Sequence, residues 1–249
     1  NLGLQKKKII YTKNNKLING GIYFFKKKLL NLIPSKICSL ENDILPELIK
    51  KNKISGNIYD NFFLDMGTPK YLKDTPHTLK KNYYRPAVFL DRDGVINHDY
   101  GYVHKVKNFI FKKGVLEGLK LLIKKKYYIF IVTNQAGIAK NIFKEIDFIN
   151  LHVYLKKKLS LQNIFFDDVQ YCPYHPSAKI KKYKKKTSLR KPGNKMIQII
   201  MNNWLVDKKN SFMIGDKLSD KKCAIKSRIG FNYATDNFFN LIKKIVKKN

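Results

Sequence analysis

Apolar and polar positions follow a regular order after Pro86 and a much less regular one before it. Beyond Pro86, short apolar runs predict strands at 88–90, 128–132, 165–171, 212–214 and 230–233. Apolar residues at helical spacing predict helices at 115–125, 146–159, 195–205, 218–226 and 238–246. Apolar strands that alternate with helices predict an α/β fold with a parallel sheet covered on both faces.

The residues before Pro86 predict a small αβ segment and a linker. We expect strands at 22–25 and 61–64, a short helix at 27–32 and a turn at 65–69. Ser39 predicts the start of a further helix, because Glu41 and Asp43 in its first turn suit the positive end of the helix dipole. The polar stretch 74–85 has no pattern. The predicted organisation is therefore a segment at 1–74, a linker at 75–86 and a domain at 87–249.

The net charge of +33 raises the question of a nucleic-acid partner. Only four of the 51 basic residues are arginines, and Lys, Asn, Ile, Tyr and Phe, whose codons are rich in A and T, are all abundant. Drift in base composition produces this bias without selection for a polyanion. A protein whose function is to bind nucleic-acid phosphates would be expected to contain more arginine, because the planar guanidinium binds phosphate through two hydrogen bonds. The charge thus argues little for nucleic acid, although it will attract anionic small molecules.

Other features narrow the class of protein. No apolar stretch approaches the ~20 residues of a membrane span, and no apolar segment near the start predicts a secretory signal. Three widely spaced cysteines do not make a disulfide framework. We expect a cytoplasmic globular protein without a membrane partner, and the oligomeric state stays open. Because the sequence begins at Asn1 rather than Met, we expect a fragment or a processed piece.

Polar motifs follow three of the predicted strands. Asp91 and Asp93 come after the first strand, Thr133 follows the second, and Asp216 follows the fourth. The carboxyl ends of parallel strands meet at one crevice, so we expect these side chains to converge. Carboxylates grouped in this way suit Mg²⁺, and one of them can also act as a nucleophile in phosphoryl transfer. Asp, Asn and Gly are also ordinary turn residues, but that explanation suits one such turn better than three aligned ones.

These motifs resemble those of the haloacid-dehalogenase-like phosphatases, from about residue 85 to the C-terminus. That family implies a three-layer sandwich with a parallel sheet and no large cap. Within this family, the segment at 99–103 resembles that of the branch that acts on heptose bisphosphates. Histidinol phosphatases lack this segment. The motifs that carry the resemblance lie at 89–97, 99–103, 132–139, 171–176, 189–192 and 214–220.

The resemblance implies Mg²⁺-dependent removal of the 7-phosphate of a heptose 1,7-bisphosphate, in the supply of nucleotide-activated heptose for cell-surface polysaccharide. Asp91 is then the nucleophile and Asp93 the general acid and base, while Thr133 and Lys191 bind the transferring phosphoryl group. Asp91, the main-chain carbonyl of Asp93, and Asp216 are the implied Mg²⁺ ligands. Arg190 pairs with the phosphate that is not cleaved. The other implied substrate-binding residues are Asp99, Tyr100, Gly101, Tyr102, Asn134, Gln135, Ala136 and Lys217.

One departure from the family concerns a structural zinc. Cys172 is present, but the other positions of the expected ligands read Tyr174, Thr187 and Leu189. With His175, the chain offers two ligands, whereas a closed structural site needs four. We therefore expect no zinc, and a loop at 173–189 that is held by packing alone and is more mobile.

The N-terminal segment resembles the sugar-binding half of sugar-1-phosphate nucleotidyltransferases at 19–23, 39–46 and 63–69. The resemblance implies that Asn19, Gly20 and Glu41 lie at a sugar and Asp65 at a metal. The glycine-rich nucleotide loop of that family is not present in the sequence, so we expect no nucleotide binding of that kind.

Three alternatives remain open from the sequence. Histidinol phosphate is a rival substrate, and a phosphorylated 3′ end of a polynucleotide is a more distant one that the positive charge favours. An inactive, basic nucleic-acid-binding scaffold is the third. It would not need Asp91, Asp93 and Asp216 together, so their joint presence argues against it.

Overall fold

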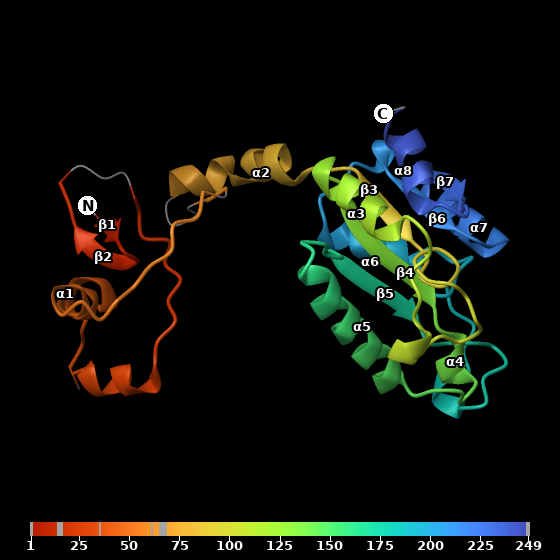
Figure 1. The fold of residues 1–249 in the computed structure, drawn as a ribbon, viewed down its shortest axis with the longest axis horizontal. Coiled ribbons are helices and arrows are strands. Elements are labelled where there is room, and N and C mark those ends of the chain that lie inside the picture. Colours follow the sequence, from red (N-terminus) through yellow and green to blue (C-terminus); the bar gives the residue numbers. More distant parts are fainter. Residues whose placement is uncertain (1, 14–16, 35, 61, 65–68, 248–249) are drawn as a thin grey trace. The chain divides into compact units, whose positions relative to one another are not determined.

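The computed structural model describes residues 2–13, 17–34, 36–60, 62–64 and 69–247. The chain divides into two compact units, 1–64 and 65–249, and each is described by itself (Figure 1). This boundary lies ten residues before the predicted one. The turn predicted at 65–69 lies mostly outside the described residues, and so does Asn61.

The first unit has an antiparallel pair of strands, β1 (Leu2–Gln5) and β2 (Lys8–Tyr11). A 3₁₀ helix follows at Lys27–Leu32, and then a π-helical turn at Leu40–Ile44 that leads into α1 (Leu45–Lys50). The predicted cap is confirmed, because Ser39 Oγ accepts a hydrogen bond from Asn42 N at 3.1 Å. Ile44, Leu45 and Leu48 form the buried centre of this unit.

The strands predicted at 22–25 and 61–64 are wrong where the structure describes them. Residues 22–25 and 62–64 are irregular, and the side chain of Phe24 is 96% exposed. An apolar run forms a strand only when it finds a partner strand and a surface to cover. In this unit the hairpin β1–β2 forms instead, in a lysine-rich stretch whose turn places Lys6 and Lys7 at positive φ.

The second unit begins with α2 (Pro69–Tyr83), so the segment expected to be an irregular linker is helical up to Tyr83. Lys80 and Lys81 lie in the last turn, where positive charge stabilises the helix dipole. The helix end is also tied to the sheet, since the hydroxyl of Tyr128 donates to Tyr83 O at 2.7 Å. Tertiary contacts of this kind override a weak local pattern.

In the described part of this unit, five strands form one parallel sheet in the order β5–β4–β3–β6–β7 (Figure 1). This confirms the predicted fold class. The central strand pairs Leu90 with Ile131 on one side and with Ile214 on the other, so β3, β4 and β6 end at the same edge. The strands are β3 (Ala87–Leu90), β4 (Tyr128–Asn134), β5 (Asp168–Cys172), β6 (Phe212–Gly215) and β7 (Gly230–Tyr233).

Helices cover both faces of the sheet, as the alternating pattern predicted. Side chains on one face, such as Val88 and Leu90, pack against α3 and α8, and those on the other, such as Phe89, pack against α6 and α7. No helix in the described ranges is long and apolar enough to cross a membrane. The helices are α3 (Val115–Lys124), α4 (Ala136–Ala139), α5 (Glu145–Ser160), α6 (Lys195–Asn203), α7 (Leu218–Ser227) and α8 (Phe238–Val246).

Candidate active site

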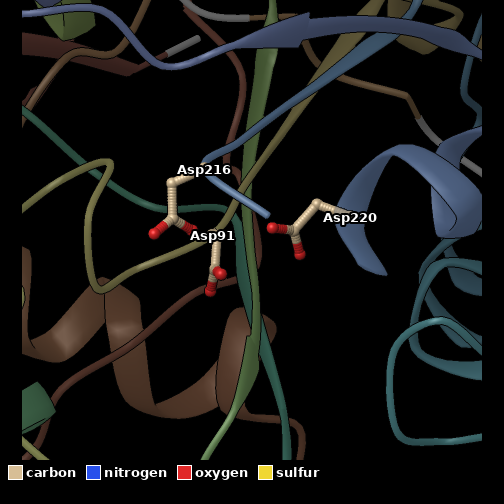
Figure 2. A group of neighbouring side chains, drawn as sticks. All are labelled: Asp91, Asp216 and Asp220. Atoms are coloured by element: carbon tan, nitrogen blue, oxygen red, sulfur yellow. The ribbon is translucent and has the colours of Figure 1, made fainter. Parts of the chain in front are cut away.

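Three carboxylates converge where β3 and β6 end. Asp91 follows β3, Asp216 follows β6, and Asp220 lies in the first turn of α7. One oxygen from each lies within 4.8 Å of the others, and Figure 2 shows the three side chains turned toward a common space. The main chain fixes this approach, because Asp91 N donates to Ile214 O at 3.0 Å. The predicted convergence of Asp91 and Asp216 is present in the structure.

Two glycines make room for these carboxylates. Gly94 has φ +81°, and a Cβ there would lie 2.5 Å from Asp216 Oδ2. At Gly215 a Cβ would lie 2.2 Å from the Cβ of Asp220. Both separations are far shorter than real contacts, so any side chain at either position would push a carboxylate away.

Lys191 is buried among the carboxylates. Its Nζ lies 2.9 Å from Asp91 Oδ2 and 2.7 Å from Asp220 Oδ1, and its side chain is 1% exposed. Burial lowers the pKa of Lys191, but Asp91 and Asp220 raise it by more, so the net pKa lies above the usual value. The group is therefore a fixed positive charge beside Asp91.

The main chain of Lys191 is held by Asn134, the last residue of β4. Asn134 Nδ2 donates to Lys191 O at 3.1 Å, and Lys191 N donates to Asn134 Oδ1 at 3.0 Å. We expected Asn134 to bind substrate. In the structure its amide connects the end of β4 to the loop that carries the lysine, and its role in substrate binding stays a prediction.

Asp220 is the functional residue that sequence reasoning missed. It lies in the motif at 214–220, from which the sequence predicts no role for it. Its carboxyl is fully buried on Lys191, and its Oδ2 also accepts a hydrogen bond from Lys217 N at 3.0 Å. Its place as the second aspartate of the motif was the sequence feature that could have identified it. It could not reveal that Asp220 orients the lysine, which lies about thirty residues earlier in the sequence.

Asp216 has the properties of a metal ligand. Its Oδ1 is buried and has no hydrogen-bond partner among the described residues. Burial raises the pKa of Asp216, and Lys217 offsets this only in part. A carboxylate oxygen that lacks a hydrogen-bond donor in this way and lies beside Asp91 suits a hard divalent cation such as Mg²⁺.

The Asp93 carboxylate lies outside the three-carboxylate cluster and has its own set of donors. Its Oδ1 accepts from Asn97 Nδ2 at 2.9 Å, and its Oδ2 from Gln135 Nε2 at 3.1 Å. Gln135 Nε2 also donates to the buried Oγ1 of Thr133 at 2.9 Å. Gln135 thus connects Asp93 to the end of β4, and Ala136 follows it at the start of α4.

The segment after β3 carries the predicted sugar residues Asp99, Tyr100, Gly101 and Tyr102. Asp99 Oδ1 accepts from Gly101 N at 3.0 Å, and its Oδ2 lies 3.2 Å from Lys217 Nζ. That lysine also lies 3.7 Å from Asp216 Oδ2. The ion pair therefore brings Asp99 and Lys217 beside the carboxylates, while Tyr100 and Tyr102 are exposed and Lys140 donates to the Tyr102 hydroxyl.

Arg190 lies at the end of the loop that runs from β5 to Lys191. It is half-buried, burial lowers its pKa, and its Nη1 donates to Tyr174 O at 3.5 Å. The loop was expected to be held by packing alone. This is wrong, because Glu145 accepts hydrogen bonds from both the Tyr171 and the Tyr183 hydroxyls, each at 2.7 Å.

A five-stranded parallel sheet with a buried lysine among three carboxylates at its strand ends is the arrangement of a phosphatase of the haloacid-dehalogenase type. A family model described as "Polynucleotide kinase 3 phosphatase" matches residues 90–245. Over this part the chain belongs to that phosphatase family of the haloacid-dehalogenase superfamily, as a homologue of the D-glycero-beta-D-manno-heptose-1,7-bisphosphate 7-phosphatases. The predicted class, a phosphomonoester hydrolase, is confirmed.

Two relatives with that name illustrate the likeness. The chain is 44% identical over 145 residues to the enzyme of Photorhabdus laumondii, and the aligned region covers 58% of this chain and 77% of the relative. It is 37% identical over 163 residues to the enzyme of Rhodopseudomonas palustris, and the aligned region covers 65% of this chain and 91% of that relative.

A solved structure shows the same fold. It is the D,D-heptose 1.7-bisphosphate phosphatase from B. bronchiseptica, complexed with magnesium and phosphate. The match has a TM-score of 0.59 and 20% identity, and it covers 66% of this chain and 99% of the other.

Replacing Lys191 tests its place between the carboxylates. Lys191→Met leaves two buried carboxylates without their cation, so the free energy of unfolding should fall by about 3–5 kcal/mol. Urea unfolding without added metal, followed by fluorescence of Trp204, measures this, since Trp204 packs on Phe130 of the sheet. Because the pKa is raised, the contribution should be complete below the ordinary lysine pKa and lost as the pH rises through the raised value.

The control is Lys217→Met, whose side chain is 58% exposed. An exposed pair contributes at most about 1 kcal/mol, so this variant should unfold almost as the parent does. Equal losses in the two variants would show that Lys191 has no special role in the fold.

Proposed function

We propose that the protein removes the 7-phosphate of D-glycero-beta-D-manno-heptose 1,7-bisphosphate by way of an aspartyl-phosphate. The observation that carries the proposal is the 44% identity to an enzyme of that name, in a chain whose Lys191 lies among three converging carboxylates. The proposal names the substrate, whereas the geometry of the site supports the type of chemistry.

Asp91 is the nucleophile in this proposal. Its carboxylate attacks the phosphorus, the bond from phosphorus to the sugar oxygen breaks, and the phosphoryl group passes to Asp91. Lys191, 2.9 Å from Asp91 Oδ2, orients the carboxylate and balances the charge that gathers on the transferring group. Thr133, buried at the end of β4, donates its hydroxyl to a phosphoryl oxygen.

Asp93 moves the protons. It gives its proton to the departing sugar oxygen, and then accepts one from the water that attacks the aspartyl-phosphate. That attack releases inorganic phosphate and restores Asp91. Gln135 and Asn97 hold the two Asp93 oxygens from different sides, so the carboxyl keeps one direction during both steps.

Asp91, Asp216 and the main-chain carbonyl of Asp93 would hold Mg²⁺. The partnerless, buried Oδ1 of Asp216 supports this assignment. Asp220 is occupied by Lys191 and serves to orient that lysine. When bound, Mg²⁺ neutralises phosphate charge so that an anionic nucleophile can approach. We propose no zinc site at Cys172.

The sugar and its second phosphate bind outside this centre. The segment Asp99–Tyr102, with Lys217, lines the sugar side, together with Asn134, Gln135 and Ala136 near the end of β4. Arg190 pairs with the phosphate that is not cleaved, because a planar fork can bind two phosphate oxygens at once. Arginine is rare in this lysine-rich chain, which makes a chance arginine here improbable.

A polynucleotide 3′-phosphatase is the second candidate. The description of the matching family model favours it, and so does the net charge of +33. It uses the same nucleophile and cation, so only the substrate separates the two candidates.

Phosphate release by the purified protein, with and without Mg²⁺, tests the function. We expect the heptose bisphosphate to be hydrolysed far faster than histidinol phosphate or 3′-phosphorylated DNA. Asp91→Asn should lower turnover by several orders of magnitude while the protein stays folded, because an amide cannot form the covalent intermediate. If Asp91→Asn kept more than about a tenth of the activity, the mechanism would be wrong. Faster release from DNA ends would favour the second candidate.

Arg190→Ala tests the contact to the second phosphate. Losing hydrogen bonds to a charged group costs about 1.5–3 kcal/mol, so KM for the bisphosphate should rise roughly 10- to 100-fold. KM for a heptose 7-phosphate without the second phosphate should change little, and Lys179→Ala, at an exposed position of the same loop, is the matched control. An equal rise for both substrates would remove Arg190 from this role.

We further propose that the N-terminal unit is a sugar-binding piece of a sugar-1-phosphate nucleotidyltransferase. Three of its side chains meet on the surface: Asn19 Nδ2 and the Tyr23 hydroxyl donate to Glu41 Oε1, at 3.3 and 3.1 Å. Hydroxyl groups of a sugar can replace such exposed hydrogen bonds. Gly20 adjoins Asn19, and Asp65 lies outside the described residues.

Calorimetric titration with a hexose or heptose 1-phosphate tests this second site in the Asp91→Asn background. Glu41→Gln should weaken binding at least about tenfold, since the carboxylate accepts from sugar hydroxyls. Glu47→Gln, an exposed glutamate paired with Lys50 on α1, is the control and should bind as the parent does. Binding that ignores both changes would contradict the proposal.

A further inference from the structure

Arg92, between the two aspartates of the first motif, is the largest of the fully buried side chains in the described part of the chain. It is one of four arginines in a sequence where 47 of the 51 basic residues are lysine. Compositional drift would thus place a lysine here. Since lysine has no planar fork, an arginine that is retained at a buried position indicates a need for that geometry.

The fork is bonded to Asp93. Arg92 Nε donates to Asp93 Oδ1 at 3.2 Å, while Nη2 lies 3.0 Å from Oδ1 and 2.9 Å from Oδ2. Asn97 and Gln135 complete the set, so donors from three residues surround one carboxylate. The side chain of Asp93 has little freedom to rotate in this arrangement.

The same guanidinium reaches two further segments. Its Nη2 donates to Val103 O, at the end of the sugar-side segment, and lies 3.4 Å from Gln135 Oε1 near the end of β4. On its other side it lies over the ring of Phe148 in α5, 5.5 Å from the centroid. One side chain therefore joins Asp93 to the segment that ends at Val103 and to the β4 end.

A buried ion pair of this kind is poorly explained by stability. Removing two charges from water costs about as much as their attraction returns, and an apolar pair of similar size often stabilises a fold more. We propose that Arg92 is a positioning residue, which fixes the direction of the Asp93 carboxylate and couples it to the segment that ends at Val103. This inference rests on the proposed function, in which Asp93 moves both protons.

Arg92→Lys keeps the charge but loses the fork, and Arg228→Lys makes the same exchange at the exposed end of α7. With p-nitrophenyl phosphate as substrate, the transfer of the phosphoryl group to Asp91 can be measured apart from the hydrolysis of the aspartyl-phosphate. Nitrophenolate leaves without being protonated, whereas hydrolysis of the aspartyl-phosphate still needs Asp93. In Arg92→Lys the initial burst of nitrophenolate should stay within about threefold of the parent rate, and steady-state turnover should fall about 100-fold. Asp93→Asn should behave in the same way, and Arg228→Lys like the parent.

Equal losses in the burst and in the steady state would mean that Arg92 only supports the fold, and this would overturn the proposal. Unchanged kinetics would overturn it as well. Turnover of the heptose bisphosphate by the unaltered protein is scored separately, so failure of the proposed function is distinguishable from failure of this inference.

A second measurement does not depend on an Arg92 variant that folds. With four arginines, each side-chain Nε–H can be assigned by nitrogen-15 NMR. In the unaltered protein the Arg92 Nε–H should exchange slowly with solvent, and in Asp93→Asn it should shift and exchange at least about tenfold faster. The Arg85 Nε–H, which donates to Asn82 O at 3.3 Å, is the internal control. An Arg92 signal unaffected by Asp93→Asn would refute the pairing.

Discussion

The candidate site depends on one buried cation. Asp91, Asp216 and Asp220 would repel one another at the end of the sheet, because three negative charges meet there and two of them are buried. Lys191 bonds to two of them, and the Asn134 amide holds its main chain in place from β4. The lysine thereby joins β3, β4, α7 and its own loop. The charge of Lys191 and the main-chain bonds at Asp91 thus act together to place the Asp91 carboxylate.

Asp91 and Asp93, which are separated by one residue, have different surroundings. Asp91 lies against a lysine and beside a second carboxylate, an environment that suits phosphoryl transfer and a cation. Asp93 is turned into a set of amide and guanidinium donors that suits proton transfer in a fixed direction. Arg92, whose main-chain N also donates to Asp91 Oδ1 at 2.8 Å, separates the two environments. In the proposed mechanism, the different roles of the two carboxylates follow from their partners and not from their residue type.

The sheet and most of the site could be predicted because buried parallel strands are apolar throughout and their ends share one edge. The N-terminal unit could not. Its strands, β1 and β2, are short and half-exposed, and residues 22–25 are apolar but find no strand partner in the described residues. The helix α2 was missed because its contact to Tyr128 is tertiary. Asp220 was missed for a related reason, since its role is defined by Lys191, which is distant in sequence.

The two tyrosine hydroxyls on Glu145 bear on the conditions that the protein can tolerate. The Tyr183 hydroxyl fastens the loop at 173–189 to the start of α5, and the Tyr171 hydroxyl of β5 donates to the same Glu145 carboxylate. A fastening of this kind contains no thiolate and no ion. Chelators therefore remove nothing from it, and oxidants that attack cysteine do not reach it. The hydrogen bond from Tyr183 to Glu145 therefore ties the loop at 173–189 to α5 with groups that are indifferent to metal supply and to redox state.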